Sequence, residues 1–281
     1  MKIRFWGVRG SVPVPGPRTL RIGGNTSCIG IETPDVVVIL DAGTGIIRLG
    51  QSLATDSRPI VLLTSHCHWD HMLGFPFFAP LWQAGREIHV VAVDSGGHSP
   101  LDMLDGHHFP KHARELPSKW QLHHDDGADL LARWGVRLTR QAVNHPGGGW
   151  GFRIQVTDHD LTYLTDHELD ATDPDAISFE AIAAFARDTD LLVHDAQFSP
   201  EERMDRCGWG HSDIERVCEL ARAANAHHLV LFHHDPMRDD NAIMELEAEA
   251  RDLLAMDNIA CTAAWEGLEF ELACRPQAFA G

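Results

Sequence analysis

The segment HCHWDH at residues 66–71 restricts what this chain can fold into more than any other feature. It directly follows PIVLLTS at residues 59–65, an apolar run with the length and composition of a buried strand. In an extended segment His66 and His68 project to the same side, and Asp70 and His71 follow as the chain turns. Four potential metal ligands therefore lie together where a strand ends.

The donor atoms of this segment indicate which ions it can bind. Imidazole nitrogens and carboxylate oxygens suit Zn²⁺, with Mn or Fe as alternatives. More than three such donors in one place exceed what one open catalytic ion needs, so the segment predicts two ions. The competing explanation is a histidine-rich surface loop, since the chain has 19 histidines among 281 residues. The position directly after an apolar strand favours the metal site.

Length and charge narrow the classes of protein and partner. We expect a single domain over residues 1–281, because layered α/β enzymes of this length commonly have one core. The formal net charge of −18 argues against a large nucleic-acid surface, since phosphate contacts normally need Lys or Arg. We therefore expect a small anionic substrate and no long nucleic acid.

The cysteines and the apolar runs indicate in which cellular compartment we expect the protein. Six cysteines form no CxxC pair, which disfavours a disulfide scaffold or a cysteine zinc site and favours a reducing cytoplasm. No apolar run approaches the roughly 18 to 20 residues that span a bilayer, so we expect no membrane segment.

Strand and helix patterns divide the chain into two similar halves. Strand-like runs occur at residues 2–6, 27–32 and 36–40, and again at 136–142, 152–156, 161–165, 190–194 and 228–232. Helical stretches follow DAGTG at 41–45, start again at 212, and cover 239–256. This order predicts an α/β sandwich with two central sheets and helices outside.

Residues 94–135 interrupt this pattern. They are rich in His, Pro, Asp and Trp with little periodicity, so we predict a loop-helix excursion over the site rather than a second domain. We expect the histidines of this segment to be solvated: His107, His108, His112, His123 and His124.

An HxHxDH segment after a buried strand resembles the signature of the metallo-β-lactamase superfamily. Its remaining ligands are matched in order by NHP at 144–146, YLTD at 163–166 and LVLFHHDP at 229–236. The resemblance implies a four-layer αββα sandwich with two divalent ions. By the same resemblance, one ion is held by His66, His68 and His145, the other by Asp70, His71 and His233, and both by Asp166. His234 is the alternative last ligand.

Two further segments resemble ribonuclease Z-type phosphodiesterases: LLVHDAQF at 191–198 and GWGHSD at 208–213. They make His211 and Asp195, together with Asp70, the candidate catalytic residues. The chain departs from that branch at Asp195, where Glu is common, and at Asp213, where Thr is common. His211 can neutralise charge on a phosphodiester and deliver a proton to the leaving group, and Asp195 can hold its far nitrogen. The alternative for His211 is a structural place beside Ser212 at a helix start.

The N-terminal segments FWGVRGSVPVPGP and GGNTSC resemble the opening of a bacterial subgroup near cyclic-nucleotide phosphodiesterases and ribonuclease Z. Arg9, Asn25 and Thr26 could contact substrate there, but turn geometry explains them equally well. Asp41 in DAGTG is expected to support the ligand loops rather than bind metal.

Together these features predict a cytoplasmic, dinuclear metal-dependent phosphodiesterase. It would hydrolyse a small nucleotide-like or cyclic phosphodiester with a metal-bridging hydroxide. No basic arm of the ribonuclease Z kind is visible, which disfavours tRNA processing. The alternatives are a carbonyl hydrolase of the same fold (a lactonase, thioesterase or β-lactamase) and a non-catalytic metal- or nucleotide-binding protein. The oligomeric state is not determined by these features, and a homodimer is one possibility.

Overall fold

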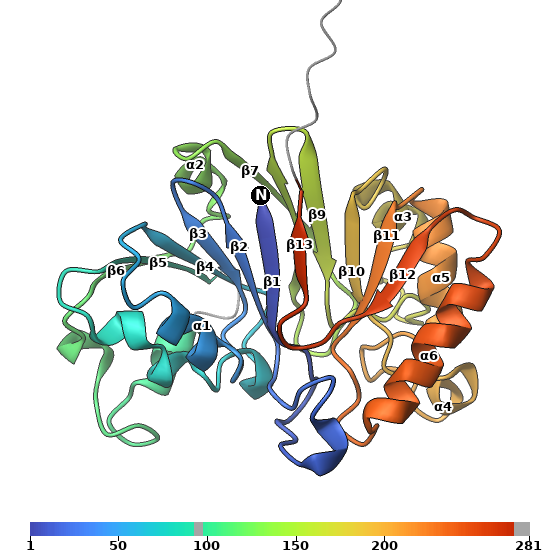
Figure 1. Ribbon diagram of the computed structural model, residues 1–281, viewed down its shortest axis with the longest axis horizontal. Coiled ribbons are helices and arrows are strands. Elements are labelled where there is room, and N and C mark those ends of the chain that lie inside the picture. The colour runs from blue at the N-terminus through green and yellow to red at the C-terminus, as the bar shows by residue number, and fades with distance from the viewer. Residues whose placement is uncertain (93–97, 273–281) are drawn as a thin grey trace, which may run out of the picture.

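Two β-sheets stand at the centre of the computed structural model, which describes residues 1–92 and 98–272 (Figure 1). The first sheet has the strand order β13-β1-β2-β3-β4-β5-β6, and the second has the order β12-β11-β10-β9-β8-β7. The first sheet comprises β1 (Lys2–Gly7), β2 (Cys28–Glu32), β3 (Val37–Leu40), β4 (Ile60–Thr64), β5 (Glu87–Ala92), β6 (Lys119–His123) and β13 (Glu269–Glu271). The second comprises β7 (Val136–Ala142), β8 (Trp150–Val156), β9 (His159–Leu164), β10 (Leu191–Asp195), β11 (His228–Phe232) and β12 (Ala260–Ala263).

Helices cover the outer faces of the two sheets (Figure 1). The α-helices are α1 (Ile46–Ser52), α2 (Ala128–Ala132), α3 (Phe179–Phe185), α4 (Pro200–Met204), α5 (Ile214–Ala223) and α6 (Asp240–Leu253). Short 3₁₀ turns are η1 (Pro17–Thr19), η2 (Trp69–His71), η3 (Phe75–Phe77), η4 (Ala79–Trp82), η5 (Pro100–Met103) and η6 (Ala113–Glu115). Among the described residues, none of these helices is long and apolar enough to cross a bilayer.

Three apolar clusters hold the layers together. The central cluster joins the facing sides of the sheets, with Phe5 and Leu63 from the first packed among Phe152 and Phe232 from the second. A second cluster packs α3, α5 and α6 on the outer face of the second sheet, and a third packs α1 and the η3 and η4 turns on the outer face of the first. This is the predicted αββα order of layers, and the prediction is confirmed.

The topology gathers strand ends at one edge. Strands β3, β4 and β5 are parallel, as are β9, β10 and β11. Strand β7 runs in the same direction as β9, because each is antiparallel to β8. Since the carboxyl ends of parallel strands share an edge, the residues that follow these strands meet where ligands bind in open α/β sheets.

Residues 98–135 differ from the predicted excursion. They contain strand β6, which pairs with β5 in parallel and extends the first sheet, as well as helix α2. KWQLH does alternate polar and apolar residues, but with only two apolar residues in a run of five at a sheet edge the signal is weak, and the strand was missed. Residues 94–97 of that segment and Cys274 lie outside the described residues. The single domain stays a prediction; the pairing of β1 with β13 supports it.

Candidate metal centre

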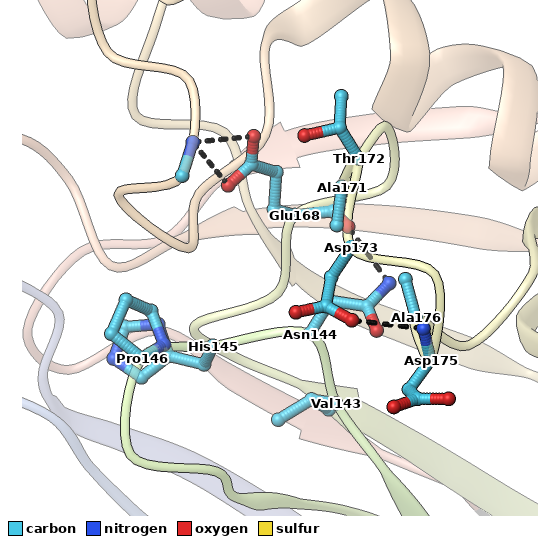
Figure 2. Close-up of a pocket in the computed structure, with 11 residues that line it drawn as sticks. Val143, Asn144, His145, Pro146, Glu168, Ala171, Thr172, Asp173, Asp175 and Ala176 are labelled. Carbon is cyan, nitrogen blue, oxygen red and sulfur yellow. Dashed lines mark hydrogen bonds between the residues drawn. The ribbon is translucent and has the colours of Figure 1, made fainter.

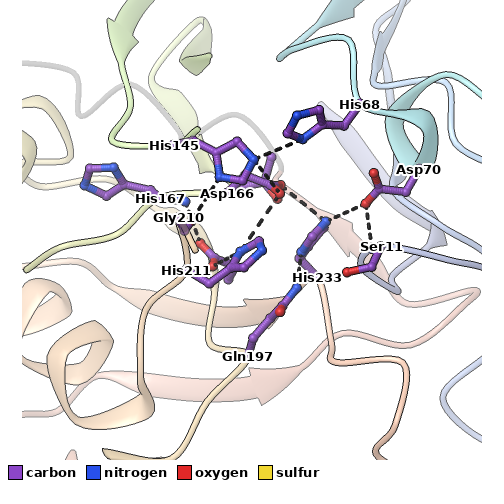
Figure 3. A network of polar contacts seen from close by, with 12 residues as sticks. Ser11, His68, Asp70, His145, Asp166, His167, Gln197, Gly210, His211 and His233 are labelled. Atoms are coloured by element: carbon purple, nitrogen blue, oxygen red, sulfur yellow. Dashed lines mark hydrogen bonds and ion pairs between the residues drawn. The ribbon is translucent and has the colours of Figure 1, made fainter. Parts of the chain in front are cut away.

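The seven predicted metal ligands come together at the shared strand edge. Figure 3 shows five of them: His68, Asp70, His145, Asp166 and His233. His66, His68, Asp70 and His71 follow β4; His145 follows β7; Asp166 follows β9; and His233 follows β11. Asp166 and His233 have φ angles of 53° and 51°. Left-handed backbone is uncommon outside glycine, although Asp and His adopt it more often than most residues, and such positions cluster at functional sites.

One group of donors consists of three imidazole nitrogens and one carboxylate oxygen. His68 Nδ1 lies 2.9 Å from His66 Nε2 and 3.1 Å from His145 Nε2. Asp166 Oδ1 lies 3.7 Å from His145 Nε2. These residues are the three predicted ligands of one ion and the predicted shared carboxylate.

A second group of donors lies on the other side of Asp166. His233 Nε2 lies 3.2 Å from His71 Nε2 and 3.0 Å from Asp70 Oδ2. Asp166 Oδ2 lies 3.2 Å from His71 Nε2 and 3.3 Å from His233 Nε2. Asp166 thus presents a different oxygen to each group.

These distances fit divalent cations in both groups. Two nitrogen ligands of a tetrahedral Zn²⁺ lie roughly 3.3 Å apart, given Zn–N bonds of about 2.0–2.1 Å. Imidazole nitrogens that face one another at 2.9–3.2 Å hold their lone pairs in a shared space. That arrangement is stable when a positive charge lies between them. The residues therefore fit two metal ions by their own geometry.

Hydrogen bonds fix which ring nitrogen is available to a metal. His71 Nδ1 lies 2.8 Å from Asp41 Oδ2, and His145 Nδ1 lies 3.1 Å from the carbonyl oxygen of Gly210. Donation by each Nδ1 leaves Nε2 of both rings as the metal-binding atom. Nε2 of the Gln197 side-chain amide lies 2.7 Å from Nδ1 of His233 and donates to it in this orientation; the reversed amide would present its oxygen to an Nδ1–H group instead.

Burial and charge set the protonation of the donors. Burial lowers the pKa of His66 and of His145, which keeps both imidazoles neutral, as metal ligands must be. Burial alone would raise the pKa of Asp166, but the adjacent His233 and His71 hold it well below its ordinary value. Asp166 is therefore ionised at the centre of the site.

The alternative last ligand, His234, lies elsewhere. Its Nε2 donates to the carbonyl oxygen of Ala264 at 2.9 Å, and burial lowers its pKa to about 3. Of the two adjacent histidines, the structure places only His233 against Asp70 and Asp166.

His211 and Asp195 form a pair beside the donors. His211 Nδ1 lies 3.0 Å from Asp195 Oδ2 and 3.9 Å from Asp166 Oδ1. Burial by itself lowers the pKa of His211, but Asp195 and Asp166 outweigh it and raise the pKa. His211 is thus poised as a cation at the edge of the site. Asp195 is fully buried and also accepts from the backbone N–H of His167.

The N-terminal candidates for substrate contact are part of the scaffold instead. Arg9 is fully buried, and its guanidinium donates to the carbonyl oxygens of Gly23 and Arg238. Asn25 donates to Glu266, and Thr26 exchanges hydrogen bonds with Thr44. These contacts favour turn geometry over substrate contact as the role of Arg9, Asn25 and Thr26.

Several supporting residues were not predicted. Glu168 is buried and accepts from the backbone N–H groups of Gly208 and Gly210, which holds the turn that carries His211. Ser11 donates its backbone N–H to Asp70 Oδ2 at 2.7 Å. The one signal for Glu168 is its place two residues after Asp166, and neither Gln197 nor Ser11 has a sequence signal.

The predicted solvated histidines lie away from the donors. His107, His108 and His124 are exposed, and His112 is half-buried. His123 is half-buried, and its Nε2 lies 3.0 Å from Nδ1 of His89, on the neighbouring strand β5.

Besides a cavity of about 440 Å³ beside His66 and His68, two larger cavities adjoin the donors. One, of about 620 Å³, is bordered by ligands of both groups and by His211, Trp69 and Trp209. The other, of about 560 Å³, lies on the far side of His145 and Pro146, and Figure 2 shows Asn144 and Glu168 along it. Both sizes suit a small organic ligand. Only the first contains the metal ligands from both sheets.

Comparisons with known proteins extend these observations. A family model described as a beta-lactamase superfamily domain matches residues 37–234. A ribonuclease Z from Haloarcula marismortui is 25% identical over 304 aligned residues, covering 90% of this chain and 91% of that protein. Two solved structures are also similar. YhfI from Bacillus subtilis, a metallo-beta-lactamase fold protein, has a TM-score of 0.69 at 18% identity, covering 96% and 99% of the two chains. The short form of human tRNase Z has a TM-score of 0.60 at 15% identity, covering 98% and 100%.

These comparisons correct one expectation. The net charge of −18 led us to expect no long nucleic acid as a partner, yet relatives that align along most of this chain are named as ribonucleases. The expectation is wrong because net charge averages over the whole surface. The field at a metal site is set locally by the ions and their neighbours.

Proposed function

This chain belongs to the beta-lactamase superfamily, and on that premise we propose that it is a two-metal phosphodiesterase. The predicted superfamily and its ribonuclease Z branch are confirmed by the family match and the ribonuclease Z relative, as is the prediction of a metal-dependent hydrolase. The observation that carries the proposal is the pair of donor groups sharing Asp166, with the His211–Asp195 pair beside them.

The proposed ligands divide as the two donor groups do. His66, His68 and His145 hold one ion, Asp70, His71 and His233 hold the other, and Asp166 binds both. Two divalent ions bound there supply Lewis acidity to the phosphoryl oxygens and lower the pKa of the attacking water. Zn²⁺ is the proposed metal, because neutral imidazoles dominate the donor set.

His211 and Asp195 supply the proton chemistry of the proposed reaction. Hydrolysis forms a bond from a water oxygen to phosphorus and breaks the bond from phosphorus to the leaving oxygen, which needs a proton. Asp195 and Asp166 outweigh burial and raise the pKa of His211, which favours its protonated form, and His211 borders the cavity. We assign it the role of proton donor to the leaving group. Asp195 holds Nδ1 of His211 and so orients the ring.

The substrate class follows from the site and its relatives. The ribonuclease Z relative supports a nucleotide-like phosphodiester, and the cavity of about 620 Å³ has room for a nucleotide around the scissile phosphate. A cyclic nucleotide fits the same description. We also propose a cytoplasmic location, which is supported by the buried thiols of Cys28, Cys218 and Cys261, none of which is in a disulfide.

Hydrolysis of bis(p-nitrophenyl) phosphate tests the proposal. Purified protein is stripped with a chelator and reconstituted with Zn²⁺ or Mn²⁺, and bound metal is counted by mass spectrometry. We expect turnover that returns with metal, two ions per chain, and loss of both turnover and metal in Asp166→Ala. Asp35→Ala, which changes an exposed carboxylate in a turn, serves as the control.

Metal binding without cleavage of this diester by any reconstituted form would overturn the phosphodiesterase proposal. Lactones and thioesters would then be the substrates to test. Cleavage of a cyclic nucleotide and of a short RNA is measured in parallel, because the charge of the chain does not decide between them.

A further inference from the structure

Two exposed tryptophans, Trp69 and Trp209, border the cavity that contains the proposed metal ligands. The residues are 77% and 61% exposed, although large aromatic side chains are highly buried on average. We propose that these indoles form a stacking site for the nucleobases of a nucleotide diester. This inference rests on the proposed phosphodiesterase function and deepens it by naming what the site recognises besides phosphate.

Trp69 is held rigidly by the metal-binding segment itself. It lies between His68 and Asp70 in the η2 turn, and its carbonyl oxygen accepts from the N–H groups of Met72 and Leu73. The backbone on both sides is therefore fixed by the turn and by the ligands. The indole extends from this fixed point into solvent, so stacking of a base orders the two side-chain torsions of the indole and leaves the backbone unchanged.

Trp209 lies in the second half of the chain, where a turn positions it. It lies between Gly208 and Gly210, whose N–H groups both donate to the buried carboxylate of Glu168. The guanidinium of Arg206 lies 6.0 Å from the centre of its ring. The first sheet therefore supplies one indole and the second sheet supplies the other.

The charges around this cavity favour an uncharged form of recognition. None of the described residues that border it is a Lys or Arg. The scissile phosphate is attracted by the proposed metal site and by His211, and Arg206 beside Trp209 is the cation that the structure places near the rest of a nucleotide. Stacking of bases on aromatic rings needs no charge, and it tolerates any base because every base has a π-face.

The position of the indoles favours a nucleobase over an apolar partner protein. A base is joined to its phosphate by a single sugar, so a phosphate at Asp166 places the attached base at the cavity border, where the indoles lie. A protein-docking surface would have no reason to share the rim of a catalytic cavity. Exposed aromatic side chains at such a rim are typical of ligand recognition.

The experiment compares two esters with the same leaving group: thymidine 5′-p-nitrophenyl phosphate and methyl p-nitrophenyl phosphate. The zinc-loaded wild-type protein is expected to have a kcat/KM at least tenfold higher for the thymidine ester, mainly through a lower KM. Trp69→Ala and Trp209→Ala are expected to reduce this ratio by about fivefold or more each. Trp69→Phe and Trp209→Phe are expected to keep most of it, because a phenyl ring also stacks.

Trp265→Ala is the matched control, since Trp265 is 38% exposed and does not border the cavity. It is expected to leave the ratio unchanged. Metal content is measured in every variant, so that a lost ion is not mistaken for lost stacking. A ratio near one in the wild type, or a ratio kept in the Trp69→Ala/Trp209→Ala double variant, would overturn the proposal.

A binding measurement separates this inference from the proposed function. Adenylyl-adenosine phosphorothioate is titrated into the zinc-loaded protein while tryptophan fluorescence is recorded. If neither ester is cleaved, the phosphodiesterase proposal fails, but quenching that disappears in the double variant still supports stacking. Unchanged quenching in the double variant counts against stacking, whether or not the esters are cleaved. The kcat/KM for adenylyl-adenosine relative to that for a single-stranded RNA distinguishes a small nucleotide from an RNA as the source of the stacked bases.

Discussion

Asp41 arranges the site without being one of its proposed ligands. Its buried carboxylate accepts from the N–H and the hydroxyl of Ser65 and from the hydroxyl of Tyr163, and it contacts His71 Nδ1. The sequence predicted a supporting role for Asp41, and the contacts agree with it. The sequence could not predict Tyr163 as a partner of Asp41, since that contact joins the two sheets across 122 positions of the chain.

The role proposed for His211 predicts a dependence on the leaving group. His211→Ala is expected to reduce kcat by about 10²–10⁴ for a dinucleotide, whose sugar alkoxide leaves poorly without a proton. The loss should be less than about tenfold for bis(p-nitrophenyl) phosphate, because p-nitrophenolate leaves without one. Steady-state kinetics on the two substrates decide the point. Equal losses on both would show that His211 is not the proton donor.

Asp195→Asn extends this prediction to pH. Asp195 contributes to the raised pKa of His211, which keeps the proton donor charged to higher pH. Activity that needs this proton is present below the pKa of His211 and is lost as pH rises through it. Removing the carboxylate lowers that pKa, so the alkaline limb of the kcat profile for the dinucleotide is expected to move to lower pH. A lower kcat with an unshifted limb would indicate a purely structural role.

The turn between α4 and α5 provides a test at the scale of elements. Gly208 and Gly210 have φ angles of 82° and 83°, a conformation that L side chains rarely adopt. A Cβ at Gly210 would lie 2.1 Å from His145 Nδ1, whereas a Cβ at Gly208 would meet nothing within 4 Å. Gly208→Ala is therefore expected to cost about 1–2 kcal/mol of stability and to keep the metal content. Gly210→Ala should also displace His145 and lose bound metal and activity.

Thermal unfolding and metal analysis of both variants check this prediction. The comparison is informative because the two glycines share one backbone conformation and differ in their neighbours. Equal metal content in Gly208→Ala and Gly210→Ala would mean that the turn does not position His145.

The predictability of most elements depended on their length and burial. Strands β4 and β11 were found because IVLLT and HLVLF are apolar runs, nearly all buried, that lead directly into histidines. Strands β5, β6, β12 and β13 were missed. Strand β6 is a partly exposed edge strand, and β12 and β13 have only four and three residues. Strand β5 (EIHVVA) is nearly all buried, so neither its length nor its burial explains why it was missed. The seven ligands were predicted because each follows a strand, and because their order along the chain resembles that of the metallo-β-lactamase superfamily. Glu168 and Gln197 were not, since their contacts depend on loops that come together only in the folded chain.

Two buried histidines predict how the whole molecule responds to acid. Burial lowers the pKa of His167 and of His234 to about 3. Between roughly pH 6.5 and pH 3 the unfolded chain binds protons at these positions and the folded chain does not. The contribution of these two histidines to the free energy of unfolding is therefore fully present above about pH 6.5. Below that pH the contribution decreases, by up to ~1.4 kcal/mol per pH unit for each histidine.

Urea unfolding of the chelated protein at pH 7.5 and pH 5 measures this effect. His234→Gln keeps a side-chain donor near Ala264 and removes one titrating group, so its midpoint is expected to fall less between the two pH values. A decrease as large as that of the wild-type protein would show that His234 does not contribute to the acid sensitivity.

The antiparallel pairing of β1 with β13 has a consequence for the order of folding. Lys2 pairs with Glu271, so a strand at one end of the described chain is completed by a strand at the other end, after the whole second sheet. On a ribosome, β1 and β2 emerge long before β13, and until β13 arrives β1 presents an unpaired edge to its surroundings. Contacts this distant in sequence slow folding, because the chain loses the entropy of closing the loop before the contact stabilises it. The edge of the first sheet beside β1 therefore stays open until the last strand of that sheet has been synthesised.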